Sequence, residues 1–217
     1  MFGNVKSPPW QDLSEAMVNK QVISRGVKDL RVIAAMKETP RHLFAPDANF
    51  IETYGDFPLP IGYGQTISQP FIVAFMTELL RLTGTEKILE IGSGSGYQSA
   101  ILSLLAKEIY SVEIIPELAA SASFLISHLN IQNVFIKSSD GYSGWAEHAP
   151  FQRIIITAAP AHLPVSLLDQ LSPGGIMVVP VGEENQKLMV LTKNETGYIA
   201  EENISVRFVP MVRQAGN

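Results

Sequence analysis

From residue 70 to residue 182, short apolar stretches alternate with longer amphipathic stretches. The apolar stretches are bounded by turn residues and have the length of buried strands, whereas the amphipathic ones have helical spacing. Strands that alternate with helices pair in parallel through right-handed crossovers. The pattern therefore predicts an α/β fold built on one open sheet.

The predicted elements follow one another in chain order. Strands are expected at residues 87–92, 108–114, 133–141, 151–159, 176–182, 187–194 and 204–212. Helices are expected at 70–82, 97–106, 115–130 and 165–175, after a helical stretch from Trp10 to Pro40 in which Asp29 is a predicted cap. The turn at 194–197 predicts an antiparallel hairpin between the last two strands, and residues 195–202 are expected to be a solvated turn.

Composition narrows the function classes. The chain has 217 residues, a formal net charge of −5 and no run of Lys and Arg, which argues against a nucleic-acid partner. Because it has no cysteine, thiolate nucleophiles and disulfides are excluded. No stretch has the apolar length that crosses a bilayer, and the first residues lack the apolar core of a signal peptide. We therefore expect a cytoplasmic protein without a membrane partner.

The sequence KILEIGSGSGYQSAIL places three glycines at alternate positions between a predicted strand and the next helix. Such a turn lets a ligand approach the backbone closely at the carboxyl end of a parallel strand. The dinucleotide fingerprint G-x-G-x-x-G fails in both registers, because its third glycine would fall on Tyr97 or Ser99. The Walker pattern fails too, since no Gly-Lys-Ser or Gly-Lys-Thr follows. A tight turn without a ligand remains the alternative.

What stands at this turn is Glu90-x-Gly92-x-Gly94-x-Gly96, which resembles the first motif of class I S-adenosylmethionine-dependent methyltransferases. The resemblance implies a Rossmann-like sheet and S-adenosylmethionine as the cofactor. S-adenosylmethionine has an ammonium and a sulfonium, which an acidic residue at the strand end attracts. The same acidic residue would repel the phosphate groups of a nucleotide cofactor. Glu90 is expected to serve this cationic side, either directly or by ordering the turn.

Two further acids end the next two strands. Glu113 lies about 20 residues past the turn, where an acid accepts from ribose hydroxyls in this architecture; the alternative is a solvated carboxylate. Asp140 resembles the residue that receives the adenine amino group, and the alternative is an Asp-Gly turn. The implied cofactor site comprises Gln65, Thr66, Glu90, Gly92, Ser93, Gly94, Gly96, Glu113, Ile114, Asp140 and Gly141.

The segment before the predicted core points to the acceptor. YGQTISQPFIVAFM, from Tyr63 to Met76, resembles the signature of protein-L-isoaspartate O-methyltransferases, and PRHLF at 40–44 resembles their N-terminal turn. The later strands match that family in order, from about Met17 to Val212 overall. The resemblance implies a single methyltransferase domain, with an N-terminal helical cap and substrate loop (1–69), a cofactor-binding core (70–195) and a C-terminal strand extension (196–217).

The reaction that the resemblance implies is methylation of the free α-carboxylate of L-isoaspartyl residues in damaged proteins and peptides. The methyl ester then collapses to a succinimide, which makes the reaction a step of protein repair. A carboxylate is ionised at neutral pH, so the reaction needs positioning and desolvation rather than a general base or a metal. The resemblance places the Ser68 hydroxyl on the substrate carboxylate, with a helix N-cap as the alternative role. It places Val209 in backbone contact with the substrate and implies a monomer.

Three alternatives remain open for the function. A sister methyltransferase would act on another carboxylate or a small molecule, and a non-catalytic relative would only bind the cofactor. An RNA methyltransferase is disfavoured by the charge, and residues 157–160 lack the Asn/Asp-Pro-Pro-aromatic motif of enzymes that methylate exocyclic amines. Two positions depart from the family pattern: Gln152 stands where an acid is expected, and Ser139 replaces the commoner glycine before Asp140.

Overall fold

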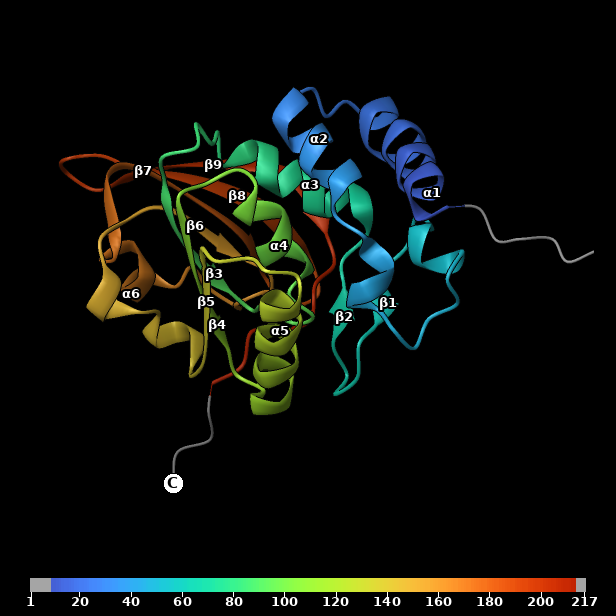
Figure 1. Cartoon of the computed structure of the whole chain (residues 1–217). Coiled ribbons are helices and arrows are strands. Elements are labelled where there is room, and N and C mark those ends of the chain that lie inside the picture. The colour runs from blue at the N-terminus through green and yellow to red at the C-terminus, as the bar shows by residue number, and fades with distance from the viewer. Residues whose placement is uncertain (1–8, 214–217) are drawn as a thin grey trace, which may run out of the picture.

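A seven-stranded sheet forms the centre of the computed structural model, which describes residues 9–213 (Figure 1). The strand order is β5-β4-β3-β6-β7-β8-β9; the first five strands run parallel, and β8 and β9 extend the sheet antiparallel. The predicted α/β sheet and its antiparallel C-terminal strands are confirmed. The strands are β3 (Lys87–Ile91), β4 (Glu108–Glu113), β5 (Val134–Ser138), β6 (Phe151–Ile156), β7 (Leu171–Val181), β8 (Gln186–Lys193) and β9 (Tyr198–Val206).

The helices begin where the sequence supplies the expected start signals. The Asp29 side chain accepts from the Arg31 and Val32 amides and caps α2, as predicted. Pro70 occupies the first turn of α3, where its missing N–H costs nothing. The helices are α1 (Trp10–Met17), continued by a π-helical turn (Val18–Val22), α2 (Leu30–Glu38), α3 (Pro70–Leu79), α4 (Tyr97–Ser103), α5 (Pro116–His128) and α6 (Val165–Leu168).

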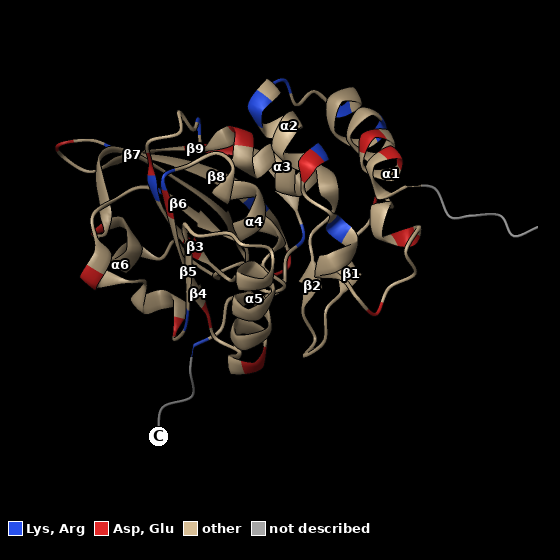
Figure 2. Cartoon of the chain, viewed as in Figure 1, with Lys and Arg blue, Asp and Glu red and all other residues tan. Residues whose placement is uncertain are grey.

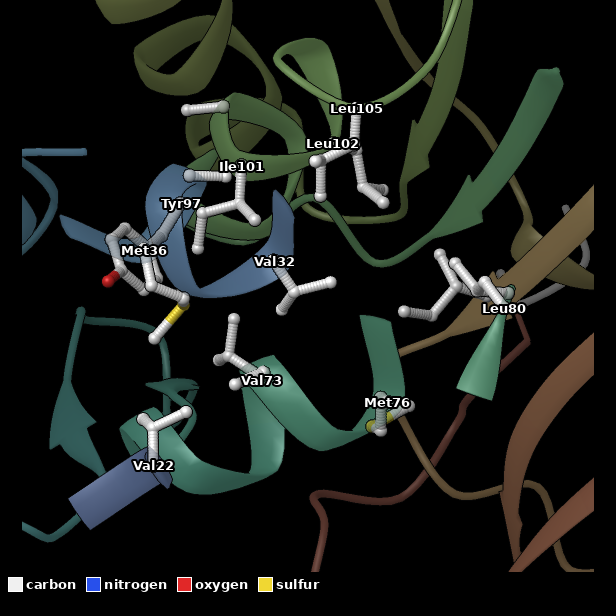
Figure 3. Close-up of a cluster of buried hydrophobic side chains, with 14 of the residues drawn as sticks. Val22, Val32, Met36, Val73, Met76, Leu80, Tyr97, Ile101, Leu102 and Leu105 are labelled. Carbon is white, nitrogen blue, oxygen red and sulfur yellow. The ribbon is translucent and has the colours of Figure 1, made fainter. Parts of the chain in front are cut away.

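Each face of the sheet has its own hydrophobic cluster, because successive strand side chains point to opposite faces. The cluster on one face joins Ile88 and Ile109 to α1–α4, and Figure 3 shows Val32 and Val73 pointing toward Ile101 within it. The other cluster contains Leu89 and packs under α6. Burial on both faces explains why these strands read as nearly continuous apolar runs.

Several predicted elements have different bounds in the structure, and the largest differences lie in the C-terminal part of the chain. The helix expected at 165–175 ends at Leu168, because Leu171 already pairs with Phe151 of β6. The expected solvated turn at 195–202 was wrong from Tyr198 onward, and the strand expected at 204–212 was wrong in its bounds, since β9 spans Tyr198–Val206. β9 is an edge strand of the sheet and pairs with β8 only. Because it is largely exposed, its sequence lacks the alternation of apolar and polar residues that predicts a strand.

The long stretch between α2 and α3 contains a small hairpin that the sequence did not reveal. Strands β1 (Leu59–Pro60) and β2 (Thr66–Ile67) pair antiparallel, and the turn between them includes Gly62 and Gly64 at positive φ. The hairpin ends immediately before Ser68. The division of the chain into cap, core and extension stays a prediction.

The connections define where a ligand fits. From β3 the chain builds β4 and β5 on one side and then returns to β6 on the other side of β3. Such a reversal of strand order opens a crevice at the carboxyl ends of the two central strands. No helix within residues 9–213 has both the length and the apolar character needed to span a bilayer.

Candidate active site

The glycine turn lies in this crevice, directly after β3. Gly92, Gly94 and Gly96 all have positive φ, a backbone conformation that other residues rarely adopt. A Cβ on Gly92 would lie 2.5 Å from Oγ1 of Thr157, which follows β6. The Thr157 hydroxyl donates to the Gly92 carbonyl oxygen at 2.6 Å. The glycine is therefore needed for the close approach of the two central strand ends.

Glu113 connects the end of β4 to the glycine turn. Its Oε2 accepts from the Gly94 amide at 2.8 Å, and its Oε1 accepts from the Ile115 amide at 3.0 Å. Although it is 5% exposed, its carboxylate borders a cavity of about 310 Å³ at the carboxyl edge of the sheet. It is the only charged residue among those that line this cavity. The solvated-carboxylate alternative does not fit this placement.

Most other predicted cofactor residues surround the same cavity. Asp140 is half-buried and uses Oδ1 to accept from the Tyr142 amide, so it orders the turn that brings Gly141 to the cavity wall. Ser93 lines a smaller inner cavity next to it, and its buried hydroxyl has no partner among residues 9–213. The residues from the predicted set that line the larger cavity are Gln65, Thr66, Gly92, Gly94, Glu113, Ile114 and Gly141.

Glu90 is fully buried and borders none of these cavities. Its Oε2 accepts from the hydroxyls of Ser111, at 2.6 Å, and of Ser99. Ser111 is its cross-strand neighbour on β4, and Ser99 lies on α4. Glu90 thus fastens α4 to the two strands behind it. Of its two expected roles, this placement favours ordering the turn over direct contact with the cofactor.

The burial of Glu90 makes the stability of the fold depend on pH. Desolvation raises the pKa of its carboxyl from 4.5 to about 7, against the bonds from Ser111 and Ser99, which favour the ionised form. The unfolded chain therefore releases this proton at lower pH than the folded chain does. As the pH rises from about 4.5 to about 7, the contribution of Glu90 to stability is lost, and above that range the loss levels off.

We predict that Glu90→Gln becomes more stable relative to the unchanged protein as the pH rises through this window. The gain is up to about 1.4 kcal/mol per pH unit, because the amide stays neutral. Urea unfolding at pH 5, 6, 7 and 8 measures the difference. Parallel stability curves for the two proteins between pH 5 and 7 would contradict the assignment.

The residues predicted for the acceptor lie at a groove of about 630 Å³ between the segment before α3 and the end of β9. Ser68 lines it together with Phe208 and Val209, and Ser68 also lines the inner cavity. The N-cap of α3 is Gln69, not Ser68, and it makes no side-chain cap bond. The alternative role of Ser68 as a helix cap is therefore not supported.

Thr157 is a residue of the candidate site that sequence reasoning missed. It lines the groove, the inner cavity and the larger cavity, as Thr66 does. Its importance depends on the adjacency of β6 and β3, which are separated by more than 60 residues in sequence. The signal available was the polar residue that follows the isoleucine run 154–156, near the carboxyl end of the strand predicted at 151–159.

The residues of the larger cavity and of the inner cavity beside it fit S-adenosylmethionine on three observations. Gly92 and Gly94 bring backbone without a Cβ to the wall of the larger cavity, and Glu113 places a carboxylate next to them. In the inner cavity, the buried Ser93 hydroxyl has no partner among residues 9–213. A cationic molecule is favoured beside the single acid of the larger cavity. The groove has the opposite charge, since Arg25 and Arg207 are its only charged lining residues. In Figure 2 the cationic positions are otherwise scattered over many elements.

Comparison with known proteins identifies the family. The model of the protein-L-isoaspartate(D-aspartate) O-methyltransferase family matches residues 12–216. A protein-L-isoaspartate O-methyltransferase of Synechococcus sp. (strain JA-2-3B'a(2-13)) is 50% identical over 214 residues, covering 95% of this chain and 88% of the relative. The enzyme of the same name from Geobacter metallireducens is 52% identical over 202 residues, covering 92% and 94%.

Solved structures agree in fold. A structure titled protein-L-isoaspartate O-methyltransferase superposes with a TM-score of 0.83 and 26% identity, covering 96% of this chain and 66% of that one. A second, from Plasmodium falciparum in complex with S-adenosyl-L-homocysteine, gives a TM-score of 0.81 at 23% identity, covering 93% and 99%. The chain therefore belongs to the protein-L-isoaspartate(D-aspartate) O-methyltransferase family, whose members transfer a methyl group from S-adenosylmethionine to isoaspartyl carboxylates.

Proposed function

We propose that this enzyme holds the isoaspartyl carboxylate at Ser68 in the groove and the cofactor in the cavity beside Glu113. The observation that supports this division most is that both spaces share Thr66, Thr157 and Val209 as lining residues. Donor and acceptor would thus meet where the two spaces adjoin, next to these three residues. S-adenosylmethionine supplies an electrophilic methyl group when it is bound.

The residues of the groove suit a substrate that needs no activation. An α-carboxylate is ionised at neutral pH, so its oxygen is already the nucleophile. The Ser68 hydroxyl donates one hydrogen bond to the carboxylate and fixes its direction, while Phe208 and Val209 replace water around it. Arg25 and Arg207 favour an anionic group in the groove. The damaged segment enters as an extended, exposed stretch of chain.

Replacing Ser68 by alanine is expected to lower kcat/KM for an isoaspartyl peptide by about 10- to 100-fold, the loss typical of one hydrogen bond to a charged group. The affinity for S-adenosylhomocysteine should stay unchanged, because Ser68 does not line the larger cavity. The assay follows label from S-adenosylmethionine into two peptides that differ only in isoaspartate versus aspartate.

Ser172→Ala is the matched control, since its hydroxyl donates to the Phe151 carbonyl at the opposite edge of the sheet. It should leave methyl transfer unchanged. Label in both peptides, or full activity of Ser68→Ala, would contradict the assigned acceptor site. If neither peptide is labelled while S-adenosylhomocysteine binds, the alternative of another carboxylate or a small-molecule acceptor is favoured.

We also propose that the enzyme acts as a monomer in the cytoplasm. Its chain forms one domain, which unfolds in a single transition and consists of a cap with the substrate loop (1–69), a cofactor-binding core (70–195) and a C-terminal extension (196–217). One chain supplies all residues of the groove and the cavity, and the lack of cysteine suits a reducing compartment. Light scattering of the purified protein tests the monomer, and cell fractionation tests the cytoplasmic location. The number of unfolding transitions tests the single domain. A dimer, a secreted protein or two transitions would overturn the corresponding part.

A further inference from the structure

Arg41 is the largest fully buried side chain that the reaction described above does not use. Its Nε donates to the Thr53 carbonyl oxygen at 2.8 Å, and its Nη2 donates to the Ser68 carbonyl oxygen at 2.8 Å. Its guanidinium carbon also lies 4.9 Å from the centre of the Tyr97 ring, in the first turn of α4. One side chain thus connects residues 66–69, which we call the acceptor loop, to the 3-10 turn at Thr53 and to the helix that follows the glycine turn.

Burying the charged guanidinium of Arg41 costs free energy that its hydrogen bonds offset only in part. None of the ion pairs found within residues 9–213 involves Arg41, and its Nη1 has no acceptor there. Burial lowers the pKa of this guanidinium because desolvation disfavours the cation. A buried charge without a carboxylate partner is costly, and an apolar side chain of similar volume often replaces such a group without loss of stability. The hydrogen bonds of Arg41 to the Thr53 and Ser68 carbonyl oxygens therefore indicate a role other than stability.

We infer that Arg41 is a positioning residue for the reaction, which fixes the backbone at Ser68 so that the serine hydroxyl faces the groove. The bond to the Ser68 carbonyl oxygen sets the peptide plane between β2 and α3. Ser68 makes this contact through its backbone and leaves its side chain to the groove. This inference rests on the proposed role of Ser68 as the residue that receives the substrate carboxylate.

The guanidinium is suited to this task because it is a rigid, planar fork. Nε and Nη2 reach two carbonyl oxygens at once, on segments that are 15 residues apart in sequence. A lysine ammonium keeps the charge but lacks the fixed spread of donors. Arg41→Lys should therefore fold and yet hold the loop loosely, whereas Arg41→Met removes the donors and the buried charge together.

Both variants are expected to lose at least about tenfold in kcat/KM for the isoaspartyl peptide, the effect of losing one charged hydrogen bond. The dissociation constant of S-adenosylhomocysteine should change by less than about threefold, since Arg41 does not line the larger cavity, in which we place the cofactor. Arg153→Lys is the matched control: this arginine also donates to backbone carbonyls, those of Leu80 and Arg81, but lies at the other end of the sheet. It should retain kcat/KM within about threefold. Thermal unfolding of all three variants reports their stability.

A double-mutant cycle tests whether Arg41 acts through Ser68. In the Ser68→Ala background, Arg41→Lys should lower kcat/KM by less than about threefold, because the positioned hydroxyl is already gone. Multiplicative losses would overturn the inference. So would a loss of activity in Arg41→Met that is matched by an equal weakening of S-adenosylhomocysteine binding.

Hydrogen exchange gives a readout that does not depend on methyl transfer. Amides at residues 66–69 should exchange at least about tenfold faster in Arg41→Lys, while those of β6 stay protected. Unchanged exchange at 66–69 would overturn the inference even if activity fell. If the unchanged enzyme does not methylate isoaspartyl peptides, the proposed function fails on that result, and the exchange measurement still decides whether Arg41 orders the loop.

Discussion

Glu113→Ala is expected to weaken the binding of S-adenosylhomocysteine by about 100-fold or more. We propose that Glu113 binds the ribose hydroxyls, and two hydrogen bonds from them to a carboxylate are each worth about 1.5–3 kcal/mol. The substitution also leaves the amides of Gly94 and Ile115 without their acceptor. The glycine turn would lose the contact that fixes it to the end of β4. Isothermal titration calorimetry of the purified protein measures the affinity directly.

The same strand supplies the control for this experiment. Glu108 is the first residue of β4 and Glu113 the last, so Glu108→Ala removes an acid at the opposite edge of the sheet. It should leave the affinity within about twofold. Glu113→Gln keeps the size of the side chain and removes its charge, so it separates the loss of packing from the loss of the carboxylate. An affinity within threefold of normal in both Glu113 variants would show that ribose is held elsewhere.

Gly92→Ala is expected to have an effect of similar size for a steric reason. A Cβ at this position would lie 2.5 Å from Oγ1 of Thr157, and the φ of +94° is strained for alanine. Backbone strain and overpacking together cost about 2–6 kcal/mol. Because the turn forms a wall of the cofactor cavity, we expect affinity for S-adenosylhomocysteine to fall by about 100-fold, together with a lower Tm.

Two further variants separate the two causes. Gly174→Ala has a comparable φ of +72° but meets no atom within 4 Å, so it reports strain alone, far from the cavity. In the Gly92→Ala background, Thr157→Ala removes the clashing atom and should recover part of the Tm. If Gly92→Ala binds the cofactor product normally, the close approach of the two strand ends is not needed for binding.

The parts of the site that the sequence predicts best are those set by local geometry. Glu113 and the glycine turn lie at the ends of adjacent elements, where strand order alone fixes which residues share one edge of the sheet. The Asp29 cap and the start of α3 at Pro70 are equally local. Ser68 was assigned by resemblance, and its opening into the groove is a structural observation that local pattern does not supply.

What escaped prediction depends on contacts between distant parts of the chain. Thr157 matters because β6 lies beside β3, and Arg41 is buried because three separate segments close around it. Arginine is usually a surface residue, and nothing in the residues next to it in PRHLF indicates that Arg41 is buried. The exposed strand β9 likewise follows from pairing with β8 rather than from its own polar sequence.

The groove draws its walls from both ends of the chain, with Ser68 on one side and residues 204–209 on the other. The glycine turn, Glu113 and Thr157 are all synthesised well before that second wall. A chain still leaving the ribosome therefore makes these residues early, but the groove and the larger cavity both lack a wall until residues 204–212 have emerged, because Val209 and the three residues after it also line the cavity. Any truncation before Val209 would open both spaces at once, so cofactor binding and recognition of damaged protein would be lost together.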